Sequence, residues 1–266
     1  ATLAGWLIYR GAILLVTEST GTIIISDDAF NAIGNGFIPD IPDIGILPGV
    51  HKLTLILGLL AILLFIIGAI NDRKKTQAYH FEVLPMNMFV LKLALVSALV
   101  GGITWVLAGY RGLSWTAVVV LIVVLVYDFI TSQTVLGRHI YAVGGNPEAA
   151  EVSGISVKNM TYVVFCSMGM LSALSGILFA SRLQSATTTA GNLFELDAIA
   201  ATFVGGVSAA GGVGRVVGSL IGALVMASLT NGMNLMGIDI SYQYIVRAAV
   251  LVVAVIFDVA TRNRGK

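Results

Sequence analysis

The chain contains long runs of apolar residues, which are separated by polar or glycine-rich stretches. Residues 53–70, 88–108 and 115–130 are the clearest of these runs. A helix of about 20 residues crosses the roughly 30 Å of hydrocarbon in a bilayer, whereas strands of a membrane barrel alternate apolar and polar positions over about ten residues. The runs are continuous and do not alternate, so they predict membrane-spanning helices.

The whole pattern predicts an all-α, polytopic transmembrane bundle, with residues 1–266 forming a single domain. The expected helices cover residues 1–16, 51–70, 86–109, 113–131, 159–181, 214–236 and 243–260, with a shorter apolar piece at 196–208. The chain starts without methionine and without basic residues ahead of its first apolar stretch. We therefore expect a fragment whose natural protein has a preceding segment.

Composition supports a bilayer as the surroundings, because 57% of the residues are hydrophobic and only 11% are charged, against roughly a quarter charged in soluble domains. The net charge of +1 gives no reason to expect nucleic acid as a partner. Cys166 is the single cysteine, and His51, His80 and His139 lack the spacing of metal ligands. The sequence therefore predicts neither a bound metal nor a cofactor.

Basic residues indicate the orientation, since short loops rich in Lys and Arg stay on the cytoplasmic side. Residues 17–50 are instead acidic and are expected to form an extracytoplasmic loop, whose prolines exclude one regular helix. That loop is either a docking surface for a soluble partner or a solvated excursion. The acidic residues of this loop are Glu18, Asp27, Asp28, Asp40 and Asp43, and its prolines are Pro39, Pro42 and Pro48. The residues expected on the cytoplasmic side are Arg73, Lys74, Lys75, Arg138, Lys158, Arg215, Arg262, Arg264 and Lys266, which places the carboxyl terminus there too.

One crossing is too short for a complete helix. Residues 196–207 are apolar, and the glycine-rich stretch 208–214 follows before the basic Arg215. This predicts a broken or re-entrant segment, because irregular backbone at membrane depth survives only inside protein or beside a wet cavity. The glycines of this stretch either mark a substrate path or allow close helix packing. Gly218 and Gly222, one helical turn apart, would also allow two helices to approach closely.

The polar stretch 132–158 contains the signals of a short surface helix. Asn146 is a favoured N-cap, Pro147 suits the first helical position, and Glu148 complements the positive helix terminus. Gly154 suits a left-handed stop. A helix of about two turns is marginal in water alone, so it depends on packing, either on its own bundle or on a partner.

The run from Gly137 to Ala150 (GRHIYAVGGNPEAA), with Ser153-Gly154-Ile155, resembles the cytoplasmic coupling loop of monosaccharide importer permeases of the ATP-binding-cassette class, in the ribose/xylose/galactose group. Blocks at 182–215 and 231–237 are similar to the later half of that family. The longer middle region, about 71–130, is most similar to the xylose branch.

The resemblance implies an importer permease architecture that forms the path for a monosaccharide, with xylose favoured, in the bacterial inner membrane. It also implies a second permease copy, two cytoplasmic ATPase subunits that hold ATP-Mg, and a periplasmic sugar-binding protein. The residues implied to contact the ATPase are Gly145, Asn146, Pro147, Glu148, Ala149, Ala150 and Gly154. The sequence itself lacks a Walker A loop, so we expect no ATP hydrolysis by this chain.

Polar residues near the broken segment are candidates for the sugar path, because hydroxyl-rich neutral solutes need modest hydrogen-bonding groups. They are Asn192, Glu195, Asp197, Thr202, Asn231 and Asn234. For Asp197, capping of the half-helix is favoured over sugar contact. Asp128 and Arg247 could pair with each other, extend to the interface or relay protons. A relay would suit the rival hypothesis, an ion-coupled secondary transporter of a small polar solute.

Overall fold

The computed structural model describes residues 2–17, 21–41, 49–79, 83 and 85–263. It consists of two compact units, Ala1–Ser26 with Val119–Lys266 and Asp27–Val118, called units 1 and 2 below. Among the residues singled out in the sequence, Glu18, Pro42, Asp43, Pro48, His80, Arg264 and Lys266 lie outside the described residues.

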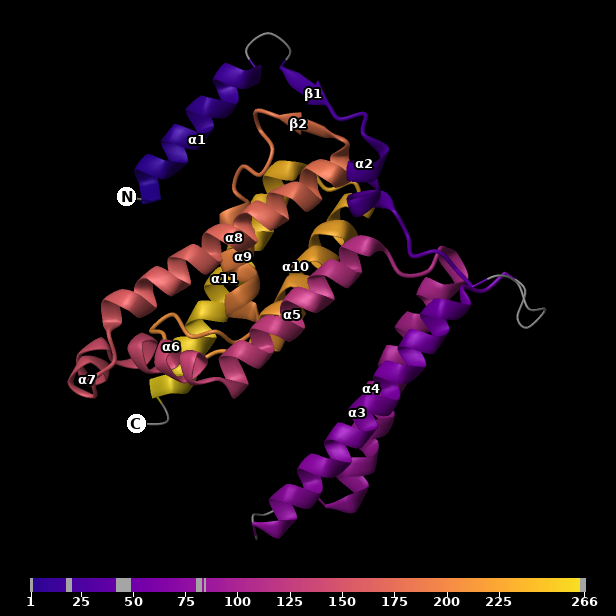
Figure 1. Ribbon diagram of the computed structural model, residues 1–266, viewed down its shortest axis with the longest axis vertical. Coiled ribbons are helices and arrows are strands. Elements are labelled where there is room, and N and C mark those ends of the chain that lie inside the picture. The colour runs from indigo at the N-terminus through magenta and orange to yellow at the C-terminus, as the bar shows by residue number, and fades with distance from the viewer. Residues whose placement is uncertain (1, 18–20, 42–48, 80–82, 84, 264–266) are drawn as a thin grey trace. The chain divides into compact units, whose positions relative to one another are not determined.

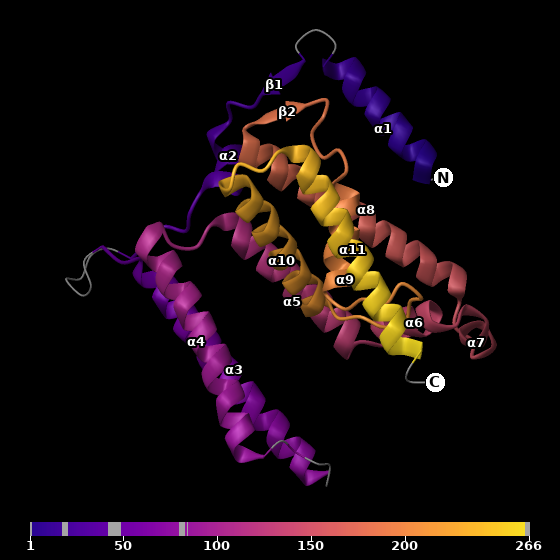
Figure 2. The same ribbon diagram turned by 180° about the vertical axis from the view of Figure 1, so that it is seen from behind.

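The predicted all-α membrane bundle is confirmed, since six described helices are long and apolar enough to span a bilayer. These are α3 (Lys52–Ala78), α4 (Met86–Tyr110), α5 (Trp115–Gln133), α8 (Val157–Leu183), α10 (Val216–Leu235) and α11 (Ile240–Asn263). The amino-terminal helix α1 (Thr2–Thr17) is apolar but shorter. Figures 1 and 2 show these helices from opposite sides.

Three short elements in the segments after α1 and after α8 were not predicted. They are α2 (Asp28–Asn35), which ends before Pro39, and the strands β1 (Thr22–Ile24) and β2 (Ser185–Thr187). The two strands are antiparallel, with Thr22 opposite Thr187 and Ile24 opposite Ser185. In unit 1 this ladder joins the segment after α1 to the segment after α8.

The longest spans extend beyond the ranges predicted for them. Helix α3 continues to Ala78, so Arg73, Lys74 and Lys75 lie in its last turns rather than in a loop. Helix α8 begins at Val157 after the N-cap Ser156, whose side chain accepts a hydrogen bond from the Asn159 N–H. Basic residues at a helix carboxyl end are favoured by the helix dipole, which explains why polar composition alone placed the end of α3 too early.

The broken segment is present in unit 1. Helix α9 (Phe194–Val204) has 11 residues and is followed by the irregular stretch 205–215 before α10 begins. Ala200 and Ala201 of α9 form a buried cluster with Met226 of α10, and Val250 and Leu251 of α11 pack against it. Helix α9 therefore lies against both α10 and α11.

Glycines allow α9 and α10 to touch through their backbones. A Cβ atom on Gly222 would overlap the Ala201 carbonyl oxygen, and one on Gly218 would overlap the Gly205 carbonyl oxygen. The close packing predicted from this pair of glycines is confirmed, and it fits a bilayer, where van der Waals contact drives helix association.

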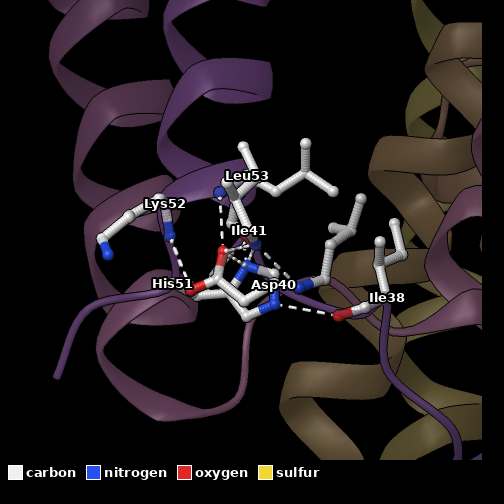
Figure 3. Close-up of polar contacts among 8 residues, drawn as sticks. Ile38, Asp40, Ile41, His51, Lys52 and Leu53 are labelled. Atoms are coloured by element: carbon white, nitrogen blue, oxygen red, sulfur yellow. Dashed lines mark hydrogen bonds and ion pairs between the residues drawn. The ribbon is translucent and has the colours of Figure 1, made fainter. Parts of the chain in front are cut away.

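In unit 2, a polar cluster holds the start of α3 to the preceding loop (Figure 3). The Asp40 carboxylate accepts backbone hydrogen bonds from Lys52 (3.2 Å), Leu53 (3.1 Å) and Ile41 (2.8 Å). Partial desolvation raises the pKa of Asp40, but the hydrogen bonds from these N–H groups lower it by a larger amount. The positive charge of His51, when its ring is protonated, lowers it as well. The net pKa therefore lies below its ordinary value of 3.8.

His51 caps α3 and joins the same cluster. Its Nε2 lies 2.9 Å from the Ile38 carbonyl oxygen and must donate to it, so Nδ1 is the acceptor for the Thr54 N–H at 3.3 Å. The Thr54 hydroxyl also lies 2.9 Å from Nδ1, and its oxygen accepts a bond from the Leu113 N–H. The cluster thus ties the loop before α3 to the turn between α4 and α5.

We expect Gly222→Ala to lower the stability of the bundle by about 1–3 kcal/mol, because the added methyl group overlaps backbone atoms of α9. Gly232→Ala, in the same helix and with no atom within 4 Å of its Cβ position, is the control and should stabilise by up to about 1 kcal/mol. Denaturant unfolding in detergent measures both. Equal effects would contradict the close-packing interpretation.

We expect the melting temperature of Asp40→Asn to lie below that of the original protein at neutral pH. A carboxylate with a lowered folded-state pKa stabilises above its unfolded pKa, and this contribution is lost as the pH falls through the folded value. The difference between the two proteins should therefore begin to shrink below about pH 3.8 and vanish only below the lowered folded-state pKa. Thermal unfolding at pH 6 and pH 3 tests this, and a constant difference would exclude the mechanism.

Candidate functional site

The polar stretch after α5 folds into two short helices. Helix α6 (Val135–Gly145) was not predicted and begins after Thr134, whose hydroxyl accepts a bond from the Gly137 N–H. Helix α7 (Pro147–Val152) follows directly. Asn146 ends α6 and caps α7, with its side-chain oxygen 3.0 Å from the Ala149 nitrogen. The short helix, its cap and its proline at the first position are as predicted.

The end of α7 is also fixed by hydrogen bonds. Gly154 has a left-handed backbone conformation, with φ of +84°, and its N–H donates to the backbone carbonyl oxygen of Glu151. The Ile155 N–H donates to the Ala150 carbonyl at 3.0 Å. These two bonds form a Schellman motif, the glycine stop that the sequence predicts. Both ends of a six-residue helix are therefore satisfied by its own flanking residues.

Five of the six residues of helix α7 are exposed, and only one is buried. Glu148 and Ala149 are exposed, whereas Ala150 is only 4% exposed and packs within its own chain. Val152 is 91% exposed, and sequence reasoning missed it. An apolar residue among polar neighbours on a short capped helix is the signal that would have found it. The exposed face of α7 therefore centres on Glu148, Ala149 and Val152.

A second feature is an open groove of about 430 Å³ between α9 and α10. Small-molecule sites have volumes of roughly 300–1,000 Å³, so the groove has a suitable size for a small solute. It brings together Asp197, Asn231 and Asn234 from the predicted sugar path. The complete lining is Asp197, Ala198, Ala201, Ala223, Met226, Ala227, Thr230, Asn231 and Asn234.

The other three path candidates lie outside the groove lining. Asn192 accepts a long hydrogen bond of 3.4 Å from Arg10, and Glu195 is exposed in the first turn of α9. The Thr202 hydroxyl donates to the Ile199 carbonyl of its own helix at 2.8 Å. A shared sequence neighbourhood thus grouped residues that point in different directions around a short helix.

A chain of polar contacts borders the groove. Arg247 of α11 donates to both carboxylate oxygens of Asp197, at 2.9 and 3.2 Å, and to Gln243 at 3.4 Å. The Gln243 side chain is buried and donates to Asn234 at 2.8 Å. Helices α9, α10 and α11 are therefore joined by one network.

This network corrects two expectations. Asp197 does not cap α9, because Leu193 is the N-cap residue and Asp197 is the fourth residue of the helix. Its carboxylate is paired with Arg247 instead. Asp128 was a possible partner of Arg247, but the partner is Asp197, from a helix 50 residues earlier. Sequence reasoning missed Gln243 and Thr230, since an isolated polar residue at the end of an apolar helix carries little signal.

The electrostatics of the groove favour a neutral ligand. The Asp197 carboxylate and the Arg247 guanidinium form a charge-matched pair, so neither presents an uncompensated charge. The remaining polar lining consists of one hydroxyl and two amide side chains, surrounded by alanines. Such groups can donate and accept hydrogen bonds to hydroxyl groups while keeping the binding modest.

We expect Asp197→Asn and Arg247→Gln each to destabilise the bundle, and the double variant to lose less than the sum. The coupling energy should be about 1–3 kcal/mol, as for residues in direct contact. Unfolding of the four proteins in detergent measures it. Glu195→Gln, an exposed acid on the same helix, is the control and should change stability by less than about 0.5 kcal/mol. Additive effects would show that the pair contributes nothing.

Comparison with known proteins gives extensive similarity to sugar permeases. The "Xylose transport system permease protein XylH" of Escherichia coli (strain K12) is 38% identical over 264 residues, which cover 99% of this chain and 64% of the relative. The protein of the same name from Haemophilus influenzae is 36% identical over 263 residues, 99% of this chain and 67% of that relative. The chain thus spans slightly less than two thirds of the length of the first of these relatives.

A relative that matches a shorter part of the chain has a higher sequence identity there. The "Ribose import permease protein RbsC" of Escherichia coli (strain K12) is 50% identical over 137 residues, 52% of this chain and 43% of that protein. No solved structure matches the chain. The family described as "Branched-chain amino acid transport system / permease component" matches residues 44–255, which include α7, the broken segment and the groove. The chain belongs to this family of transport permeases.

Proposed function

We propose that the chain is the membrane-spanning permease part of an ATP-driven importer that carries a monosaccharide across the bacterial inner membrane. Its cargo in this proposal is xylose or a closely similar pentose. The carboxyl terminus and α7 then lie in the cytoplasm, and residues 17–50 lie outside it. The relatives that match almost the whole chain are named for xylose transport, which supports the assignment.

The observation that carries the proposal is the exposed, doubly capped helix α7. Six residues are too few for a stable isolated helix, yet both ends are fixed by Asn146 and by the Schellman motif at Gly154. Such a helix is pre-ordered and presents Ala149 and Val152 outward. Pre-ordering lowers the entropy cost of docking, so the helix fits the role of a rigid plug in a groove of an ATPase.

The groove between α9 and α10 supports a neutral, hydroxyl-rich cargo. Asn231 is exposed in the groove, and Thr230 and Asn234 lie beside it. A pentose carries several hydroxyl groups that both donate and accept hydrogen bonds, which matches this lining. Charged amino acids would meet the already paired Asp197 and Arg247 and would have to disrupt that pair.

The partners in this proposal are a second permease copy, two cytoplasmic ATPase subunits and a periplasmic sugar-binding protein. The ATPase subunits supply the ATP-Mg chemistry, and this chain has no catalytic role. Its sequence contains no Walker A loop. The basic residues Arg138, Lys158 and Arg215 flank the segments placed in the cytoplasm, in agreement with the positive-inside rule.

Reconstitution of the complete permease chain with its ATPase and binding protein tests the proposal. We expect xylose, delivered by the binding protein, to stimulate ATP hydrolysis and to enter the vesicles in the presence of a protonophore. Uptake that needs no ATPase and is abolished by the protonophore would instead support an ion-coupled secondary transporter.

In the same assay, Ala149→Trp should abolish sugar-stimulated ATP hydrolysis, because an indole group on the exposed face of α7 prevents close docking. Docking of the binding protein, measured by its co-purification, should be unchanged. The control is Ala173→Trp, the same substitution at an exposed position of α8. Normal stimulated hydrolysis in Ala149→Trp would contradict the role of α7.

A further inference from the structure

Two glycine pairs bring the end of α6 against the irregular stretch after α9. A Cβ atom on Gly144 would lie only 3.0 Å from the Gly212 nitrogen, and one on Gly212 would lie 2.7 Å from the Gly145 Cα atom. A Cβ atom on Gly211 would overlap the Gly144 carbonyl oxygen. The two segments therefore touch backbone to backbone. The contact is called the glycine joint below.

A hydrogen bond one turn earlier on α6 strengthens the glycine joint. The Tyr141 hydroxyl donates to the Gly214 carbonyl oxygen at 2.8 Å. Gly211 and Gly212 have φ values of +81° and +71°, a conformation that side chains other than glycine rarely adopt. The stretch 211–214 is thus held at both ends by α6.

The glycine joint is directly continuous with α7. Asn146 is at once the last cap of α6 and the first cap of α7, so no flexible linker separates the two helices. Figures 1 and 2 show α6 and α7 in sequence at the end of unit 1 where α9 ends. A displacement of α7 therefore moves α6 as well.

The other side of the glycine joint is continuous with α9. The Val207 N–H donates to the Thr202 carbonyl of α9, and the Ser208 N–H donates to the Val213 carbonyl, which lies directly after the glycines of the joint. Helix α9 in turn carries Asp197, which lines the groove and binds Arg247. Bonded contacts thus run without interruption from α7 to the groove.

We propose that the glycine joint is the element through which movement of α7 reaches α9 and alters the groove. Backbone contacts have no side-chain rotamers to absorb a displacement, so they transmit it more directly than a contact between long side chains. Tyr141 and Gly144 are positioning residues in this mechanism. The inference rests on the proposed function, because it takes α7 as the helix that an ATPase moves.

The test uses Gly144→Ala and Tyr141→Phe in the reconstituted transporter. Both should retain a bound ATPase and basal ATP hydrolysis, because neither residue is on the exposed face of α7. Sugar taken up per ATP hydrolysed should fall by at least about fivefold, the lower end of typical coupling between distant sites. Tyr141→Phe removes only a hydroxyl group, so it keeps the test valid should Gly144→Ala fail to fold.

The matched control is Gly169→Ala in α8, where an added Cβ has no atom within 4 Å, and its uptake per ATP should equal that of the original protein. Original values for both Tyr141→Phe and Gly144→Ala would overturn the inference, as would loss of the bound ATPase in these variants. In both of these outcomes the original transporter still couples sugar uptake to ATP hydrolysis, so the proposed function is not affected. Failure of the original protein to couple sugar to ATP would refute the proposed function instead.

Discussion

The constraint on which unit 1 depends is that backbone polar groups must find partners wherever the chain is irregular and shielded from water. The stretch 205–215 interrupts the helices, and each unpaired N–H or C=O that is kept from water there costs several kcal/mol. The Ser208 N–H pairs with Val213, and the Gly214 carbonyl pairs with Tyr141. The break is therefore possible only because α6 and its own turns supply those partners, which fixes α6 and α9 relative to each other.

Small residues have two consequences along the same pair of helices. Gly218 and Gly222 let α10 approach α9 until their backbones touch. Farther along, Ala198, Ala223 and Ala227 are too short to fill the space between the helices, and the groove results. Close contact at one end and an open groove at the other therefore share one physical cause. The polar groups of the groove can then be few, because alanines provide its walls.

Features that depend on local sequence were predictable, and features that join distant segments were not. The spans follow from continuous apolar runs, and the caps of α7 follow from Asn146, Pro147 and Gly154. The pairing of Asp197 with Arg247 joins residues 50 positions apart, and no local pattern indicates it. The strands β1 and β2 are three residues each, too short for any periodicity. Only three of the six candidates for the sugar path line the groove, because an α-helix has 3.6 residues per turn and only some neighbours in sequence share a face.

Helix α9 and the stretch that follows it contact α11 at two places, and the order of these contacts along the chain gives the relative direction of the two segments. Asp197 binds Arg247, and Ser208 donates to Asp258 at 3.2 Å, with each pair 50 residues apart. In α11 the two anchors are about three turns apart and lie on one face, whereas Asp197 is in α9 and Ser208 follows the end of that helix. The two segments therefore run parallel, and α11 ends where the glycine-rich stretch lies. The segment from Asp197 to Ser208 is therefore held to α11 near both of its ends, and in the proposed mechanism the Asp197 carboxylate is the point where a displacement of the glycine-rich stretch reaches the groove.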